Sequence, residues 1–196
     1  MRITIFVAVL LGGVTLHGQD RDQPPPAGAP KSAYQLEMEK QWKLHPALAI
    51  GAPAPDFELP GINGKKHTLA DYENSQVLAV MFICNRCPAS QLYEERIMKM
   101  VADYKARSVQ FIAIQPNAVS AITQHELNFT DVDDSLASMI VHAKFKNFNF
   151  PYLCDGDTQQ IAHLYGPKNT PQIFVFDRDA NCATRDASTT RCARTG

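Results

Sequence analysis

The chain has 196 residues, of which 45% are hydrophobic and 20% charged, with a formal net charge of -1. This composition is that of one soluble domain with a hydrophobic core, and it excludes a surface basic enough to bind nucleic acid. The five cysteines are too few and too irregularly spaced for a small fold held together by disulfides.

The N-terminus is expected to be an export signal, over residues 1–18. A positive start is followed by an apolar stretch, residues 3–16, which is too short for a comfortable membrane span, and then by a cleavage region near residues 17–19. We expect a periplasmic or other extracytoplasmic protein, attached to a membrane only if the signal stays uncleaved. Residues 19–50 follow as a proline-rich linker with a short helix over residues 32–44.

The folded domain is predicted for residues 51–179, and it begins with extended chain. The segments at residues 57–59 and 66–69 flank the turn residues Gly61 to Gly64, which indicates a β-hairpin.

The next segment carries the candidate chemistry. Val77 to Ile83 is a continuous apolar run, which predicts a strand buried on both faces, and it stops at a Cys-x-x-Cys pair formed by Cys84 and Cys87. From Gln91 the apolar residues recur with helical period. Because the first turn of a helix favours a thiolate, we expect Cys84 to be the exposed nucleophile. Arg86 would lower its pKa further, and Cys87 would complete the exchange.

The remaining elements continue the strand-helix alternation. A buried strand over residues 109–114 is expected to be parallel to the first, since a helix joins the two. A helix begins near residue 134, with a buried side made by Leu136, Met139, Ile140 and Ala143. Further segments are a strand at residues 150–154, a short helix at 159–164 and a strand at 172–177.

Several polar or reactive residues are expected to have ordinary roles. Glu94, Glu95 and the acidic run at residues 131–134 are interpreted as solvated or helix-starting charges. Cys154 ends an apolar strand and is interpreted as a small buried hydrophobe, with a resolving-thiol role as the lesser alternative. Pro171 directly precedes a strand, where a cis X-Pro bond is one way to make a tight turn.

Together these motifs resemble the thioredoxin-like superfamily, in particular the exported redoxins related to alkyl hydroperoxide reductase and thiol-specific antioxidant (AhpC/TSA) proteins. The matching pieces are Ala-Pro-Asp-Phe at 54–57, Cys-Asn-Arg-Cys-Pro at 84–88, Phe-Pro-Tyr-Leu at 150–153 and Thr-Pro at 170–171. The resemblance implies an α/β thioredoxin-like fold, a central mixed sheet flanked by helices. It also implies that Pro171 is cis and that Thr170 holds an extended substrate beside Cys84.

The function implied is thiol-disulfide oxidoreduction through a mixed disulfide. Substrates would be protein or small-molecule thiols and disulfides, and a redox partner would recycle the dithiol. No organic cofactor and no metal are implied, because the two thiols carry the chemistry themselves.

Two alternatives stay open. Peroxiredoxins carry Pro-x-x-x-Thr-x-x-Cys, with Thr at the place of Cys84 and the peroxidatic cysteine at the place of Cys87; the Pro and Thr are missing here, which favours the dithiol. Copper-handling proteins of cytochrome oxidase assembly carry Cys-x-x-x-Cys-Pro and a distant His. The spacing here is one residue short, and His142 and His163 both fall on expected helices.

The C-terminus departs from the family pattern. Residues 180–196 contain almost no large apolar residue, so we expect an aberrant or disordered tail and a fold whose C-terminal strand and covering helix are missing. We hypothesise a shift of reading frame near Ala180, which the coding DNA tests. On this hypothesis Cys182 and Cys192 have no evolved role.

Overall fold

The computed structural model describes residues 30–121 and 133–187. The predicted signal, the start of the linker and the end of the tail with Cys192 lie outside these residues. Within the described ranges, no helix has both the length and the apolar character needed to cross a membrane.

The elements follow the predicted order closely. Helices and strands are α1 (Ala33–Leu44), β1 (Glu58–Pro60), β2 (Lys66–Thr68), η1 (Leu69–Tyr72), β3 (Val77–Phe82), α2 (Pro88–Tyr104), η2 (Lys105–Arg107), β4 (Val109–Gln115), η3 (Val119–Ala121), α4 (Leu136–Lys146), β5 (Tyr152–Cys154), α5 (Gln160–Tyr165), β6 (Gln172–Phe176) and β7 (Cys182–Ala187).

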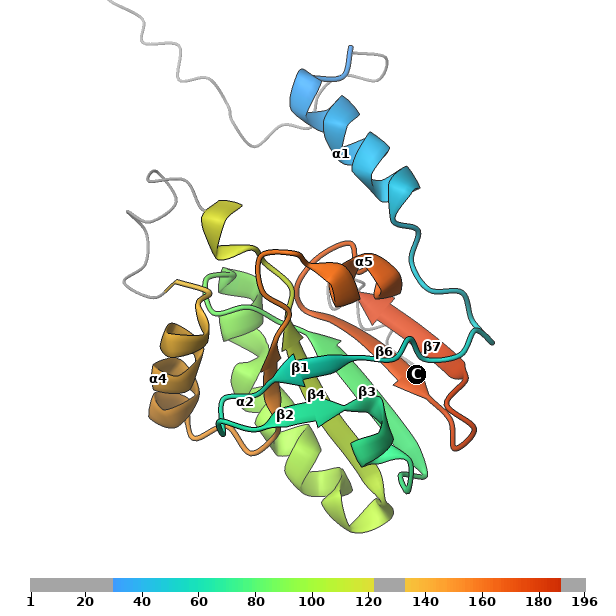
Figure 1. The fold of residues 1–196 in the computed structure, drawn as a ribbon, viewed down its shortest axis with the longest axis vertical. Coiled ribbons are helices and arrows are strands. Elements are labelled where there is room, and N and C mark those ends of the chain that lie inside the picture. Colours follow the sequence, from blue (N-terminus) through green and yellow to red (C-terminus); the bar gives the residue numbers. More distant parts are fainter. Residues whose placement is uncertain (1–29, 122–132, 188–196) are drawn as a thin grey trace, which may run out of the picture.

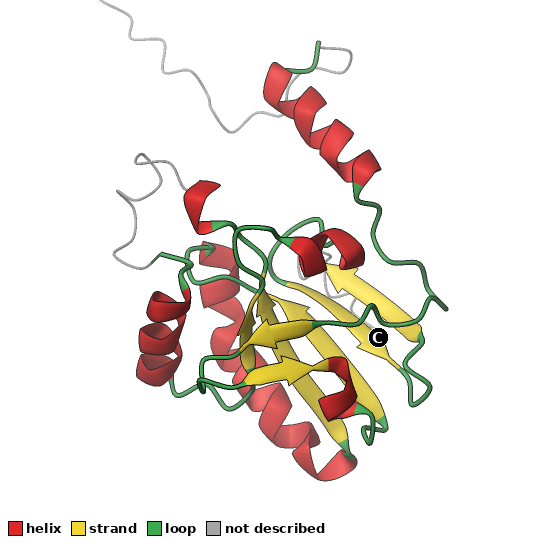
Figure 2. Ribbon diagram, in the orientation of Figure 1, coloured by secondary structure: helices red, strands yellow, loops and turns green. Residues whose placement is uncertain are grey.

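A five-stranded mixed sheet forms the centre of the molecule, in the order β5-β4-β3-β6-β7 (Figure 2). β3 pairs in parallel with β4, as predicted, and β4 pairs in parallel with β5. β6 and β7 are antiparallel additions on the other side of β3. The β1–β2 hairpin lies in front of the sheet in Figure 1, and α2 passes behind it.

The core has two halves, one on each face of the sheet, because successive side chains of a strand point to opposite faces. Leu78, Val80 and Phe82 of β3 pack with residues of the hairpin and α5. Ala79 and Met81 pack with residues of α2 and α4. β3 is therefore buried on both faces, as its apolar run predicted, and its C-terminal end is held rigidly where the Cys-x-x-Cys pair begins.

The buried faces of α2 and α4 are only partly as predicted. Met139 and Ala143 of α4 are buried, but Ile140 is 43% exposed and His142 takes the inner position instead. Ile97 of α2 is buried as expected.

Glu94 of α2 corrects the sequence interpretation, because it is 2% exposed and not solvated. Its Oε1 lies 2.6 Å from His142 Nε2 and its Oε2 lies 3.0 Å from Lys146 Nζ, so the buried charge is paired. Burial raises the pKa of Glu94, but the hydrogen bonds from His142 and Lys146 outweigh it and leave that pKa below its ordinary value. The pair joins α2 to α4.

The expectation that the tail supplies no strand is wrong, because β7 pairs with β6 over Cys182–Ala187. Its start is also held by the N-terminal segment: Gly51 N donates to Cys182 O and Cys182 N donates to Ala52 O, each at 2.8 Å. Arg185 Nη1 donates to the carbonyl oxygens of residues 47 and 48. Backbone hydrogen bonds hold this strand, and they need no large apolar side chain.

The covering helix that the family pattern places after this strand does not occur in the described part of the chain, whose last element is β7. On the α2 side of the sheet, an apolar hollow of about 370 Å³ remains beside β6 and β7. It is lined by Val77, Ala79, Met100, Tyr104, Val109, Phe111, Ile173, Val175 and Thr184.

Candidate active site

The two cysteines lie in the loop between β3 and α2, but their order of exposure is opposite to the prediction. Cys84 is buried, with 4% of its surface exposed, and its backbone N lies 3.4 Å from Ser90 Oγ. Cys87 is half-buried and is the N-cap of α2, whose first residue is Pro88. The expectation that Cys84 is the exposed thiol at the helix N-terminus is therefore wrong. Proline favours the first helical position, so Pro88 was the signal that could have indicated Cys87 as the cap.

The Thr170–Pro171 peptide bond is cis, as predicted, and it lies against both cysteines. Thr170 Oγ1 is 3.3 Å from Cys84 Sγ, and either atom can donate. Cys87 Sγ, as a thiol, donates to Thr170 O at 3.2 Å. Thr170, in the loop before β6, thus contacts both sulfur atoms. The predicted site residues Cys84, Cys87, Thr170 and Pro171 therefore lie together.

The two thiols have opposite pKa shifts, because one proton is shared between them. A hydrogen bond from Cys84 is the largest cause that lowers the pKa of Cys87 to about 4; burial opposes it, and hydrogen bonds from Thr170 and Ser90 add to it. The same hydrogen bond raises the pKa of Cys84, and burial and the negative charge of Asp134 raise it further. The half-buried Cys87, at the N-cap of α2, is therefore better placed than the buried Cys84 to carry the charge of a thiolate.

Arg86 was predicted to tune this pair, and that role stays a prediction. Its charge acts on Asp133, whose pKa is lowered chiefly by a hydrogen bond from Ser135 and to a smaller degree by Arg86. The Nε atom of Arg86 is buried and has no hydrogen-bond partner among the described residues.

A buried carboxylate fixes the loop between the cysteines, and sequence reasoning missed it. Asp134 is 1% exposed. Its Oδ1 accepts from Asn85 N at 2.8 Å and from Arg86 N at 3.4 Å, and its Oδ2 accepts from Asn117 Nδ2 at 2.9 Å. The acidic run was interpreted as solvated or helix-starting charges. Asp134 does lie just before the N-cap of α4, Ser135, but nothing local in the sequence shows that the start of α4 meets this loop.

Further polar contacts support Asp134 and the loop. Gln115, fully buried at the end of β4, donates from Nε2 to Asp134 O at 2.6 Å and to Asn117 O at 2.9 Å. Asn85 Nδ2 donates to Asp133 O at 2.9 Å. Buried polar groups that are satisfied in this way hold one geometry, so the Cys-x-x-Cys loop is preorganised.

The other candidate residues lie outside this cluster. Cys154 is buried at the end of β5, and burial raises the pKa of its thiol; its resolving role stays a prediction. His142 is bonded to Glu94, and His163 stacks on His45 with 3.9 Å between ring centroids. No group of three or more His, Cys, Asp or Glu side chains suited to a metal occurs in residues 30–121 and 133–187.

Comparison with known proteins identifies the family of the chain. Residues 50–184 match the sequence profile of the AhpC/TSA family. The chain belongs to that family. It is also 23% identical, over 135 residues, to the thiol-disulfide oxidoreductase ResA of Geobacillus thermodenitrificans. That match covers 68% of this chain and 66% of the relative, so the chain spans slightly less than two thirds of the relative's length.

Solved structures show the thioredoxin-like fold. A hypothetical protein of Sinorhizobium meliloti 1021 is 30% identical with a TM-score of 0.65, covering 76% of each chain. A thiol-disulfide oxidoreductase of Bacteroides fragilis has a TM-score of 0.56 at 16% identity, covering 69% of this chain and 90% of that one; at this identity the likeness shows the fold alone. The predicted α/β class, a mixed sheet flanked by helices, is confirmed.

Proposed function

We propose that this protein is an exported thiol-disulfide oxidoreductase in which Cys87 attacks and Cys84 resolves, with Thr170 and Pro171 as the docking edge for the substrate. The order of attack reverses the one expected from the sequence. The observation that carries it is the position of Cys87, half-buried at the N-cap of α2 with its pKa lowered to about 4, beside a buried Cys84 whose pKa is raised.

The first step uses the thiolate that the site already stabilises. Cys87 S⁻ attacks one sulfur of a substrate disulfide, a Cys87–substrate disulfide forms, and the other substrate sulfur leaves with the electron pair and takes a proton. Thr170 O and Oγ1 lie within 3.3 Å of the two cysteine sulfurs, so a substrate chain running along Thr170 would lie beside the reacting atoms.

The second step follows from the loss of the thiolate. The hydrogen bond to Cys87 is the largest cause that raises the pKa of Cys84, and it disappears once Cys87 is in a mixed disulfide. Cys84 then loses its proton, attacks Cys87 Sγ and releases the second substrate thiol, which accepts that proton. The substrate gains two electrons and two protons, and the protein keeps a Cys84–Cys87 disulfide. A partner thiol protein must return the electrons, or accept them when the reaction runs in reverse.

Trapping tests the proposal and the order of attack together. The Cys84→Ser protein should hold a substrate on Cys87 as a stable mixed disulfide, because the resolving thiol is missing. The matched Cys87→Ser protein should hold none. If Cys87→Ser is the variant that traps, the sequence-based order is right; if neither variant forms a mixed disulfide with small or protein disulfides, the proposed activity is wrong.

The proposed export and the proposed redox partner are supported by the sequence and by the redox compartment, and not by the geometry of the site. Residues 1–18 have the pattern of a secretion signal, and a dithiol in an oxidising compartment needs a partner that resets it. Fractionation of cells that express the full chain tests the location: recovery of the protein in the cytoplasm, with residues 1–18 still attached, would oppose it.

A second candidate is hydroperoxide reduction, favoured by the thiolate at Cys87. This cysteine is at the place of the peroxidatic residue of peroxiredoxins, and its lowered pKa gives the form that attacks an O–O bond. Cys87 would take one oxygen of the hydroperoxide and become a sulfenic acid, and the rest of the hydroperoxide would leave as an alcohol. Cys84 would then attack the sulfenic sulfur, which releases water and forms the disulfide. The assay measures peroxide-dependent oxidation with an added thiol as reductant. Activity that survives in Cys84→Ser but is lost in Cys87→Ser would support hydroperoxide reduction. The copper alternative has no supporting contact among the described residues.

A further inference from the structure

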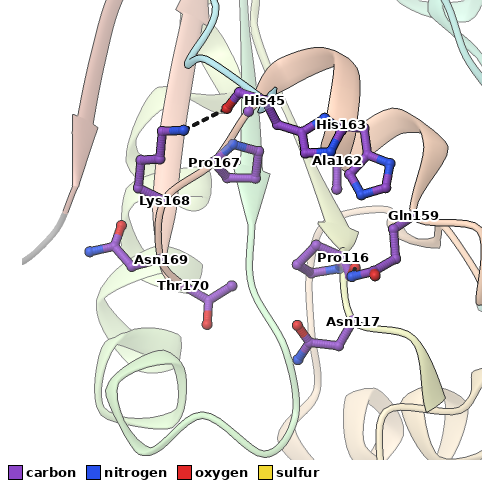
Figure 3. A pocket seen from close by; sticks show the side chains of 11 residues that line it. His45, Pro116, Asn117, Gln159, Ala162, His163, Pro167, Lys168, Asn169 and Thr170 are labelled. Carbon is purple, nitrogen blue, oxygen red and sulfur yellow. Dashed lines mark hydrogen bonds between the residues drawn. The ribbon is translucent and has the colours of Figure 1, made fainter. Parts of the chain in front are cut away.

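His45 and His163 stack on each other in the lining of a pocket of about 350 Å³ that also contains Thr170 (Figure 3). Their ring centroids are 3.9 Å apart, and the interplanar angle of 11° makes the rings nearly parallel. His163 belongs to α5, whereas His45 belongs to the segment that follows α1. The stack therefore joins two parts of the chain that are distant in sequence.

Further contacts hold the segment after α1, residues 45–48, on the domain. Lys168 Nζ, from the loop that leads to the cis peptide, donates to His45 O (Figure 3). Leu48 N donates at 2.9 Å to the carbonyl oxygen of Tyr165, the last residue of α5. Arg185 Nη1 of β7 donates to the carbonyl oxygens of residues 47 and 48. Residues 45–48, the anchored segment, thus connect α5, β7 and the loop before β6.

The charges that face the two rings are mostly positive. Desolvation lowers the pKa of His45, and the charges of His163 and Lys168 lower it further. Arg185 is the charged group of β7 that contacts the anchored segment. Asp155 lies before α5: burial raises its pKa, whereas hydrogen bonds from the α5 backbone and attraction to His163 oppose the rise. The other described side chains of the lining are neutral. A proton on His163 is therefore near a carboxylate, whereas a second proton on His45 meets the positive charges of His163 and Lys168.

We infer that the stack is a pH-sensitive switch, which holds the anchored segment on the domain while His45 is neutral and releases it when both rings are protonated. Two imidazolium rings at 3.9 Å repel each other, and the ammonium of Lys168 adds to the repulsion. Because His45 takes up a proton less readily in the stacked state, protons favour the released state. The stack contributes fully above the ordinary histidine pKa of about 6.5, and it weakens as the pH falls below that value.

Release of the anchored segment would act on the loop beside the dithiol. Lys168 would lose His45 O as an acceptor, and the pocket would lose the wall that His45 supplies. Thr170 follows in the same loop and contacts both cysteine sulfurs, so a looser loop would change the surroundings of the thiols. The switch goes beyond the proposed function and does not depend on it, because it concerns the attachment of a segment and not the thiol chemistry.

Amide hydrogen exchange followed by NMR tests the switch, with the Leu48 N–H as the reporter. Its protection factor compares the observed rate with the intrinsic rate at the same pH, so the direct effect of pH on exchange cancels. A single charge pair at about 4 Å in water changes an equilibrium about fivefold. In protein purified after expression of the full chain, we therefore expect the protection of Leu48 to fall about fivefold or more between about pH 7.5 and about pH 5. The Cys182 N–H, which donates to Ala52 O at 2.8 Å, should keep its protection within about twofold.

Two aromatic variants identify the rings as the titrating groups. His45→Phe and His163→Phe each keep an aromatic ring in the stack and remove one site of protonation, so Leu48 should be protected equally at both pH values. His67→Phe is the matched control. It removes a histidine of the β1–β2 hairpin, whose Nδ1 lies 2.9 Å from the Tyr72 hydroxyl, and it should leave the fall at Leu48 unchanged.

Three results would overturn the inference. Equal protection of Leu48 at both pH values in the wild type would show that the stack does not respond to pH. A fall that persists in both phenylalanine variants would assign the titration to other groups. An equal fall at Cys182 would show that acidification loosens the fold in general and not the anchored segment.

Discussion

The buried carboxylate of Asp134 should control both the stability of the fold and the reactivity of Cys84, and Asp134→Asn separates its charge from its shape. The carboxylate accepts two backbone N–H groups on one oxygen and the Asn117 amide on the other, at 2.8 to 3.4 Å. An asparagine is neutral and has a single oxygen, so both sides lose a charged acceptor and one side meets an NH2 donor in its place. Hydrogen bonds to charged groups contribute about 1.5 to 3 kcal/mol each, and we expect a loss of that size in the free energy of unfolding.

The same substitution should change the chemistry in a stated direction. The negative charge of Asp134 helps to raise the pKa of Cys84. Its removal should therefore lower that pKa, and it should speed the release of a mixed disulfide at Cys87. The pKa is measured by alkylation of Cys84 as a function of pH in a Cys87→Ser background, with and without Asp134→Asn, by following the peptide that contains Cys84.

Asp157→Asn is the matched control for stability. Asp157 also accepts backbone N–H groups, from Val119 at 2.8 Å and Ser120 at 3.3 Å, but at an exposed position. Surface changes of this kind cost about 0.5 kcal/mol or less, so chemical denaturation should rank the two variants clearly. If Asp134→Asn unfolds within about 0.5 kcal/mol of the wild type, and the alkylation midpoint of Cys84 does not fall, the assigned role of Asp134 is wrong.

Three further predictions concern the thiolate, the buried ion pair and the last strand. Because the pKa of Cys87 is lowered to about 4, its alkylation rate should stay nearly constant from about pH 6 to 8, whereas an ordinary thiol would slow about tenfold per pH unit below its pKa; a steep profile opposes the assignment. Glu94→Gln removes the charged acceptor that His142 and Lys146 share at a buried position and should cost about 1.5 to 3 kcal/mol in denaturant unfolding. Because the pKa of Glu94 is lower in the folded state, its ionisation stabilises the fold fully above the unfolded pKa of about 4.3 and progressively less as the pH falls through the folded pKa. The difference in the free energy of unfolding between Glu94→Gln and wild type should therefore shrink on acidification below about pH 4. Cys182→Ser places a hydroxyl at a site 1% exposed and should cost about 1 to 3 kcal/mol, whereas Thr184→Ser at an exposed site of β7 should cost little; equal, negligible costs would mean that β7 is not formed in solution.

The sequence by itself determined the local elements around the site. The apolar run of β3, the Cys-x-x-Cys pair after it and the helical period of α2 are properties of neighbouring residues, so periodicity alone reveals them. A proline directly before a strand left a cis bond as one of a few turn conformations, and it was the family resemblance that indicated the cis form of Pro171. Family resemblance then brought Thr170 to the two cysteines, which periodicity could not do.

The tertiary structure decided which thiol reacts and what surrounds it. The exposure of Cys84 and Cys87 depends on where α2 begins and on how deeply β3 enters the core, and a shift of a few residues reverses their roles. Asp134 and Glu94 look like solvated charges in the sequence, because their partners are 48 or 49 positions away along the chain. β7 escaped prediction for a related reason: backbone hydrogen bonds to β6 and to the segment near Gly51 hold it, and no pattern of its own side chains records those contacts.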